Sequence, residues 1–548
     1  MIPIKIRCGC GQKYAFDVEP VEGAMGYAVL CPVCGVDGTA LANEVIAERL
    51  GARPPSAPAL RLGREVLSRA TLPPMPPNVP SFGRTAGKSG PNIRNKRLVW
   101  ALSGTVLAAV VLTGGIVFAR SAGLGKKPMA SGAAVPDGLP HTTAELNAWY
   151  VEPPSGQNAA IFVGDAIGAL HLANVESSAA PLLGRGKLPP LGGGPLSASV
   201  KSSVGALIRS NRDALQFFSQ ASKCDQSRYP VDFNLGVEAT FPHLSKMMGA
   251  SQLLELAAVL HADASDAKSS IEDLRSAFAL ANSLGPEPYL SSQSVRARLV
   301  VVALAGLEQS ANRVCWTPEA SAGLFKDLAR MEDFDARGEG FTRGVVAERV
   351  LTMSLLANPA KFLELLPMLA GDVSAERRQR MMARLQSGKL QAEERFFDQT
   401  WGNLIQLRRQ PFPERLKGDE MIRQQIAVAA REQLVLAEFL LSGLKIAARE
   451  ARCVACLRLG LTATALEQFR AAHANRYPAS LAELTPGLLG TVPTDPFDGQ
   501  PLRYQTKSDG YELYSVGPEI KDDLGRSLNG KQEHIKFELV IPPKAKKD

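Results

Sequence analysis

The sequence predicts a multidomain protein in which a small cysteine-rich module, one membrane helix, a mainly α-helical array and a C-terminal α+β module follow one another. Three observations carry this prediction. Residues 98–119 hold 22 uncharged positions, four cysteines precede them in two close pairs, and the Ala- and Leu-rich chain beyond them repeats its apolar residues every three or four positions. That last spacing is typical of amphipathic helices.

Length and charge narrow the class of protein. A chain of 548 residues is long enough for several domains. Its formal net charge of +8 is spread along the chain, with small clusters only beside residues 98–119 and at 544–547. Specific nucleic-acid binders gather their basic residues on one face or helix, so we expect no specific nucleic-acid binding here.

The N-terminal module, residues 1–45, is predicted to bind zinc. Cys8 and Cys10 form one pair, Cys31 and Cys34 form another, and a glycine follows each pair. Two glycine-permitted turns offer four thiolates, the number that a tetrahedral Zn²⁺ needs. The strand-like run KYAFDV lies between the pairs. So small a module gains from the metal the free energy that its core cannot supply. The alternative is a pair of disulfides.

This module resembles the small zinc ribbons at the N-termini of many bacterial membrane proteins, and CPVCG at 31–35 is the best-matching piece. The Cys-x-Cys spacing of the first pair departs from the Cys-x2-Cys usual in that family. A structural or protein-docking role is expected, because Lys5, Arg7 and Lys13 are the only basic residues of the module. Thiolate ligands suit a reducing compartment, which favours a cytoplasmic N-terminus.

Residues 98–119 are predicted to cross a membrane. As a helix they would be roughly 33 Å long, against about 30 Å for a bilayer core. Residues 46–97, a disordered Pro-rich stretch, and residues 120–140 are predicted linkers on either side. Four basic residues flank the front of the segment and three flank the back. That bias also favours a cytoplasmic N-terminus, with the long C-terminal part on the outer side of the cell inner membrane.

Residues 141–450 are predicted to form a helical array or irregular bundle. Their periodicity predicts an antiparallel helical pair over 250–265 and 266–285. The run VVVALAGL beyond this pair is too short to span a bilayer. Further helices are expected over 292–313, 318–333 and 373–385 and in a long run from about 420 to 475.

The helical region resembles a family of envelope proteins from planctomycete-like bacteria, over about residues 140–540. The matching pieces are NAWYVEPPSGQNAAIFVGDA, KLPPLGGGPL and CDQSRYPVDFNLGVEATFPHLSKMMGASQLL. This resemblance implies an architecture and no particular activity.

Polar residues of the helical region form no recognisable catalytic motif. No histidine belongs to an HExxH or similar metal pair, and no GxSxG nucleophile motif is present. We expect His243 to pack against or cap a helix. The remaining clusters, His261 with Asp263 and Asp266, and Glu332 with Asp333 and Asp335, are expected to be a solvated helix end and a solvated turn.

Four cysteines lie beyond the membrane segment, where an oxidising space permits disulfides. Cys453 and Cys456 are three positions apart in a helical pattern, which fits a mutual disulfide poorly. Cys224 and Cys315 are far from them in sequence. Two interpretations stay open: a bridge from Cys224 to one of the pair, or thiols that pack as small apolar side chains.

Residues 451–548 are predicted to be an α+β module. An amphipathic helix precedes a turn at Tyr477-Pro478 and a second short helix. The period then changes to strands, PLRYQT and YELYSVG, on either side of a turn at Ser508-Asp509-Gly510. A helix packed on a small antiparallel sheet is the expected product.

This module resembles the globular domain of the major pseudopilin of type II secretion over about 85 residues. The match is carried by RYP at 476–478, DPF at 495–497, QPLRY at 500–504 and 510–517. In that family the final loop holds Ca²⁺, which implies that Asp522 and Asp523 bind calcium here. The alternative is a polar, exposed turn. A pseudopilin runs its membrane helix directly into this domain, whereas a long helical region intervenes here.

Together these patterns favour a single-pass, membrane-anchored envelope protein with a non-enzymatic binding or scaffolding role, linked to type II secretion or pilus-like machinery. The expected cofactors are structural Zn²⁺ and, through the resemblance, Ca²⁺. The expected partners are the membrane and other proteins. The alternatives are a transmembrane signalling protein that docks a cytoplasmic partner through its zinc ribbon, and an envelope hydrolase with a dispersed site.

Overall fold

The computed structural model of the protein describes two separate parts of the chain. These are residues 2–7 and 13–18 with isolated positions between 29 and 49, and residues 138–540 apart from short gaps at 173–174, 176–177, 370–373, 432–433, 438–444, 509 and 519–534. The chain divides into two compact units, Met1–Ser131 and Gly132–Asp548. The predicted membrane segment 98–119 and both predicted linkers up to residue 137 lie outside the described residues.

The first unit contains an antiparallel hairpin of β1 (Ile2–Arg7) and β2 (Lys13–Val18), in which Ile4 pairs with Phe16. The strand predicted at KYAFDV is therefore confirmed. Ile4 and Ile6 alternate along β1 and are buried with four other apolar residues of the unit. The first cysteine pair, Cys8 and Cys10, falls in the connection between the strands, outside the described residues.

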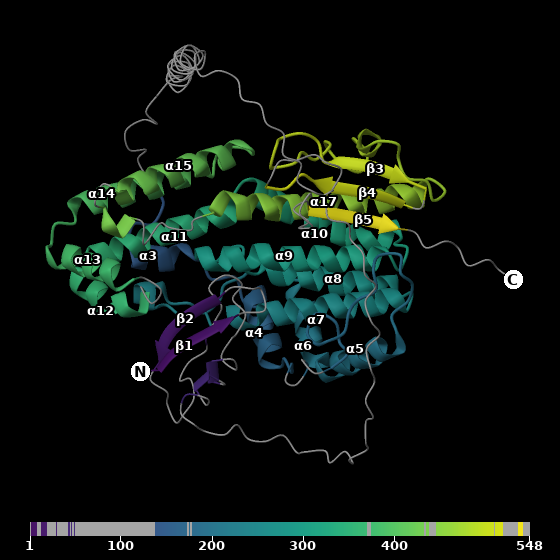
Figure 1. The fold of residues 1–548 in the computed structure, drawn as a ribbon. Coiled ribbons are helices and arrows are strands. Elements are labelled where there is room, and N and C mark those ends of the chain that lie inside the picture. The colour runs from purple at the N-terminus through teal and green to yellow at the C-terminus, as the bar shows by residue number, and fades with distance from the viewer. Residues whose placement is uncertain are drawn as a thin grey trace, which may run out of the picture. The chain divides into compact units, whose positions relative to one another are not determined.

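The second unit is a mostly helical body, as the sequence predicts. In Figure 1 its long helices lie in successive layers, and α12 to α15 gather at one end. The elements are α3 (Thr143–Trp149), α4 (Ala159–Gly168), α5 (Ala198–Ser210), α6 (Arg212–Ala221), η2 (Phe233–Glu238), α7 (Leu244–Asp263), α8 (Ala267–Asn282), α9 (Leu290–Ala311), α10 (Pro318–Ala336), α11 (Glu339–Leu356), α12 (Pro359–Leu369), α13 (Ala375–Gln386), α14 (Gln391–Leu407), α15 (Glu414–Arg431), α17 (Ile446–Ala472) and η3 (Leu481–Leu484).

Helix boundaries follow local capping chemistry. The α7–α8 pair predicted from periodicity is present, and the side chain of Asp266 caps α8 by accepting a hydrogen bond from the Ser269 amide. Thr317 caps α10 in the same way, with Pro318 in its first turn. The long run predicted from about 420 to 475 is not one continuous helix, because residues 434 and 445 are not helical; α15 ends at Arg431 and α17 begins at Ile446.

α9 lies at the centre of the body and packs against α7, α8, α11 and α17. Among the described residues it is the one helix long and apolar enough, by length and composition, to cross a membrane. Of its apolar stretch, 61% is buried inside the body. The run VVVALAGL, predicted to be too short for a membrane span, is thus part of a 22-residue helix surrounded by other helices.

A three-stranded antiparallel sheet of β3 (Arg503–Lys507), β4 (Gly510–Ser515) and β5 (Ile535–Val540), in that order, covers one side of the body. It contacts α17 and α9, and Figure 1 shows it lying across α17. The hairpin predicted around residues 508–510 is confirmed. Gly510 is required there, because a Cβ atom at this position would lie 1.8 Å from the Leu539 carbonyl oxygen.

Two features of the C-terminal region differ from the prediction. The second short helix is a 3₁₀ turn, η3, and α17 runs without a break through the predicted domain boundary at 450/451. The carboxylate of Asp495 is fully buried and accepts hydrogen bonds from the Phe497 and Val516 amides and the Ser515 hydroxyl. The Asp495 carboxylate thus joins the DPF segment at 495–497 to the end of β4.

Candidate functional site

All six predicted metal ligands lie outside the described residues. Within the part of the chain that the structure describes, no group of three or more His, Cys, Asp or Glu side chains is arranged to hold a metal ion. The zinc ligands Cys8, Cys10, Cys31 and Cys34 and the calcium ligands Asp522 and Asp523 therefore stay predictions.

His243 packs in the core, as one of the two predicted roles requires. Its ring stacks on Tyr229 at 3.9 Å between centroids, and its Nε2 lies 3.1 Å from the buried Glu287 carboxylate. It stands at the start of α7 but makes no capping hydrogen bond through its side chain.

The cluster predicted at the end of α7 separates into three different contacts. His261 pairs with Asp273 at 2.6 Å, Asp266 caps α8, and the Asp263 carboxylate is buried. The prediction of a solvated helix end is correct for Asp266 and wrong for Asp263, whose side chain is only 3% exposed and pairs with Lys201 at 2.7 Å.

The solvated turn predicted at Glu332, Asp333 and Asp335 is wrong, because all three residues lie within α10. Asp333 does face solvent, but Asp335 is 2% exposed and pairs with Arg296 of α9 at 2.5 Å. The helix continues past a polar run because its apolar face is buried by α17 and α8.

All four cysteines of the described helical body are free. The predicted alternative of a bridge from Cys224 is therefore not realised, and the packing interpretation holds for Cys453 and Cys456, which are buried on α17. Burial raises the pKa of both thiols, so neither is a thiolate near neutral pH.

One cleft of the body, of about 140 Å³, combines apolar and polar walls. It lies between the loop that follows α6, the end of α8 and its following turn, and α10; we call it the α6–α8–α10 cleft. Apolar groups from three helices and the turn form part of its wall: Ala159, Ala279, Pro286, Met331 and Phe334.

The loop 224–230 that forms one wall is held by buried hydrogen bonds. The Asn158 side chain accepts from the Arg228 amide at 2.9 Å and donates to the Arg228 carbonyl at 2.9 Å. The Tyr229 amide donates to the Tyr150 hydroxyl, and the Tyr229 hydroxyl lies 2.7 Å from the hydroxyl of Ser283, the residue that follows α8. These contacts fix the loop against α4 and α8.

Two arginines and two aspartates line the cleft in balanced pairs. Arg275 Nε donates to Asp327 at 2.8 Å, and Arg330 pairs with Asp225 and lies 3.6 Å from the second oxygen of Asp327. All four side chains keep some solvent exposure. The cleft thus presents both signs of charge and no strong net charge.

Several polar groups of the cleft have no partner among the residues that the structure describes. The Ser227 hydroxyl is buried and makes no hydrogen bond within this part of the chain. The side-chain amides of Gln226 and Asn282 make no hydrogen bond with the described residues. A buried hydroxyl left unpaired costs free energy, which a bound ligand would recover.

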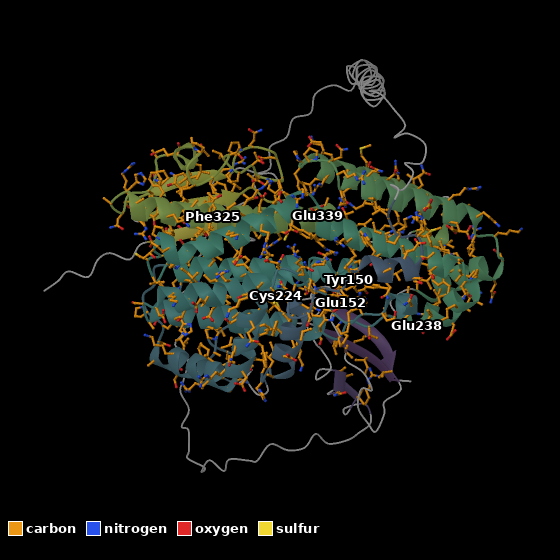
Figure 2. The ribbon with its side chains drawn as sticks, turned by 180° about the vertical axis from the view of Figure 1, so that it is seen from behind. Tyr150, Glu152, Cys224, Glu238, Phe325 and Glu339 are labelled. Carbon is orange, nitrogen blue, oxygen red and sulfur yellow. The ribbon has the colours of Figure 1, made fainter. Side chains whose placement is uncertain are left out.

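Cys224 lines the same cleft, and Figure 2 labels it together with Tyr150 and Glu152 of the segment between α3 and α4. Burial, and then the neighbouring Asp225, raise the pKa of its thiol. The thiolate is the nucleophilic form, so this environment makes Cys224 a poor nucleophile near neutral pH. The α6–α8–α10 cleft can therefore bind a ligand through hydrogen bonds and ion pairs.

Sequence reasoning did not find this cleft. Its charged pair Asp225 and Arg330 is 105 positions apart, and no local spacing relates the two residues. The one available signal was the polar run CDQS at 224–227 inside a segment singled out only for its resemblance.

Comparison with protein-family models, with curated proteins and with solved structures gave no match for this chain.

Proposed function

We propose that the chain is a single-pass, membrane-anchored envelope protein whose helical body binds a polar partner and does not transform it. The observation that carries the proposal is the α6–α8–α10 cleft, where unpaired hydrogen-bonding groups stand beside apolar wall residues and balanced ion pairs. Such a site suits a small zwitterionic or polar ligand, or a polar peptide segment, because it offers both charges at short range.

The anchoring part of the proposal rests on residues 98–119, whose uncharged length matches a bilayer core. The link to type II secretion or pilus-like machinery rests on the C-terminal resemblance, and the hairpin of β3 and β4 is compatible with it. In this proposal the sheet contacts the machinery, and the cleft on α8 and α10 takes the ligand.

Co-purification tests the proposal. Full-length protein is isolated from gently solubilised native membranes, and bound proteins and small molecules are identified by mass spectrometry. We expect secretin, pilin or secretion-ATPase components, together with a ligand that is lost from Ala279→Phe, which fills the cleft. Lys268→Phe places the same side chain at an exposed position of α8 and serves as the matched control.

The outcomes separate the parts of the proposal. A preparation without secretion components contradicts the link to that machinery. A bound set that is the same in the Ala279→Phe and Lys268→Phe variants contradicts the assignment of the cleft.

A second candidate, transmembrane signalling, is favoured by one specific observation. The hairpin of β1 and β2 and the helical body precede and follow residues 98–119 in the sequence, and they belong to different compact units. This candidate predicts that Cys31→Ser abolishes binding of a cytoplasmic partner while ligand binding in the cleft is unchanged. Loss of neither, or of both, would contradict it.

A further inference from the structure

A second cavity, of about 250 Å³, lies between a glycine-rich loop and the ends of α7 and α9. We call it the glycine-loop cavity. The loop is the segment 190–195, and the opposite wall is formed by Asp263, Asn312 and Arg313. It shares no lining residue with the α6–α8–α10 cleft.

Arg313 is a buried cation with unused hydrogen-bond donors. Its side chain is 7% exposed. Nη1 donates to the backbone and side-chain oxygens of Gln309 at 2.7 and 2.6 Å. Nε has no hydrogen-bond partner, and Nη2 donates to none of the described residues. A guanidinium group carries five N–H donors, and leaving several unpaired in a buried place is costly.

Asp263 neutralises Arg313 only in part, because other donors share its carboxylate. One oxygen accepts from the Leu196 amide at 2.8 Å, and the other pairs with Lys201 at 2.7 Å. The distance from Arg313 Nε to Asp263 is 3.9 Å, too long for a hydrogen bond. Arg313 in the cavity wall and Lys201 beside it thus supply two positive charges against the single negative charge of Asp263.

Asn312, the third residue of this wall, already has hydrogen-bond partners within the protein. The Asn312 amide hydrogen-bonds to the backbone of Glu538 and Val540. The partial negative charge at the end of α9 is offset at Gln309, whose carbonyl accepts from Arg313. On this side of the cavity, the N–H groups that remain available to a ligand are therefore those of Arg313.

The glycine loop lines the same cavity as Arg313 and contributes backbone amides that donate to none of the described residues. Gly192 and Gly194 have φ values of +69° and +85°, whereas Gly193 between them does not have a positive φ. Alternation of backbone hand is the pattern in which successive N–H groups converge to bind an anion. The Gly193 amide donates to the Pro190 carbonyl, whereas those of Gly192 and Gly194 donate to none of the described residues.

We propose that the glycine-loop cavity binds an oxyanion of phosphate size. Arg313 Nη2 supplies the charge, and the Gly192 and Gly194 amides supply neutral donors. A metal cation is disfavoured, because Arg313 and Lys201 would both repel it. This site is independent of the function proposed for the cleft.

The test measures phosphate binding to the full-length protein in detergent by calorimetry, in phosphate-free buffer at constant ionic strength. The probes are inorganic phosphate and glycerol 3-phosphate, which separate the free ion from a phosphate ester. We expect saturable binding that Arg313→Gln weakens at least about tenfold. Arg185→Gln removes an exposed positive charge shortly before the glycine loop in the sequence, and this variant is expected to bind phosphate like wild type.

Two further variants make the test decisive. Asp263→Asn removes the negative charge and retains an acceptor for Leu196, so it should tighten phosphate binding several-fold. A cation site would instead be lost. Gly194→Ala keeps every charge but strains the loop at its positive φ, so it should weaken binding even if Arg313→Gln fails to fold.

Absence of saturable binding to either probe, or equal effects of Arg313→Gln and Arg185→Gln, overturns the proposal. Binding of glycerol 3-phosphate alone would assign the site to phosphate esters.

Discussion

Buried charged side chains connect the central helices of the body. Asp335 of α10 pairs with Arg296 of α9, and Glu450 of α17 lies 2.9 Å from Arg415 and 3.3 Å from Arg408. All five are at most 2% exposed. A buried pair of this kind adds little over an apolar pair, but breaking it leaves an unpaired charge in a dry environment.

Asp335→Asn should therefore destabilise the body by about 3–5 kcal/mol, since Arg296 keeps its charge and loses its counterion. Urea unfolding followed by circular dichroism measures the loss. Asp333→Asn, two positions away on the same helix, removes a carboxylate that is 61% exposed and should leave the midpoint nearly unchanged. Similar effects of the two substitutions would contradict the assigned burial.

Glu255 gives the body a defined pH dependence. Burial raises the pKa of this α7 carboxyl to about 8, and it makes no ion pair with the described residues. The folded state thus holds the proton more tightly than the unfolded state, in which the carboxyl has an ordinary pKa. This contribution to stability is fully present below about pH 4.5 and is lost as the pH rises through about 8.

Glu255→Gln should flatten part of this decline, because the amide cannot ionise. Glu348, whose pKa burial raises to about 7, acts in the same direction and leaves a residual slope. Urea unfolding between pH 5 and 9 measures the effect. Glu272→Gln, at an exposed position of α8, is the control, and an unchanged pH profile in Glu255→Gln would refute the assignment.

The burial of Asp335 could not be predicted from local sequence. The run MEDFDA is polar at three of six positions, and nothing within it distinguishes Asp335 from Asp333. The difference is made by Arg296, which is 39 positions away and meets Asp335 only after α9 and α10 have packed. When tertiary packing brings two ionic partners together, the spacing of residues along the sequence does not reveal the pair.

At the scale of elements, α9 and β5 are joined by side chains that bond to a strand backbone. Asn312, just past the end of α9, donates to the Glu538 carbonyl at 2.8 Å and accepts from the Val540 amide at 2.7 Å. Glu308 accepts from the Glu538 amide at 2.6 Å. The helix thus occupies the edge of the sheet that a further strand would otherwise pair with.

Asn312→Ala should free two backbone groups of β5 and cost about 2 kcal/mol, since both are half-buried and would lose their partners. Hydrogen exchange should be faster at the Val540 amide and in β5 generally, and less so in β3. Asn312→Asp keeps the acceptor for Val540 and loses the donor, so its effect should be intermediate. Unchanged exchange in β5 for both variants would contradict the role of Asn312.

Elements with strong local signals were predictable from sequence, and β5 was not. The α7–α8 pair and the turn of β3 and β4 follow from periodicity, capping and glycine placement over fewer than about 40 residues. β5 lies beyond residues 519–534 and owes its place to Leu539 and Phe537 packing under the sheet and to Asn312 on a distant helix. The α6–α8–α10 cleft was missed for the same reason.

At the scale of the whole molecule, the two compact units make separable predictions. The zinc ribbon predicted at residues 1–45 gains its stability from the metal, whereas the helical body has a large apolar core of its own. Loss of the metal should therefore affect only the first unit.

Full-length protein is expected to carry one zinc per chain, and Cys31→Ser should lose it. The thermal unfolding midpoint of the helical body should stay unchanged, because that unit contains none of the four ligands. Elemental analysis and calorimetry provide the two readouts. Retention of stoichiometric zinc by Cys31→Ser would contradict the ligand set, and a lowered midpoint of the body would contradict the independence of the units.

The joint between α9 and β5 also bears on how the chain is completed during synthesis. The Asn312 side-chain amide donates to the Glu538 carbonyl, and this hydrogen bond cannot form until Glu538, 226 positions later, has been synthesised. Until the ribosome has released that strand, the end of α9 and the adjoining face of α17 stay uncovered. Contacts between such distant positions form late and slowly. Until β5 has paired, the exposed surface of the nascent helical body could associate with other chains, so rapid docking of β5 would protect it.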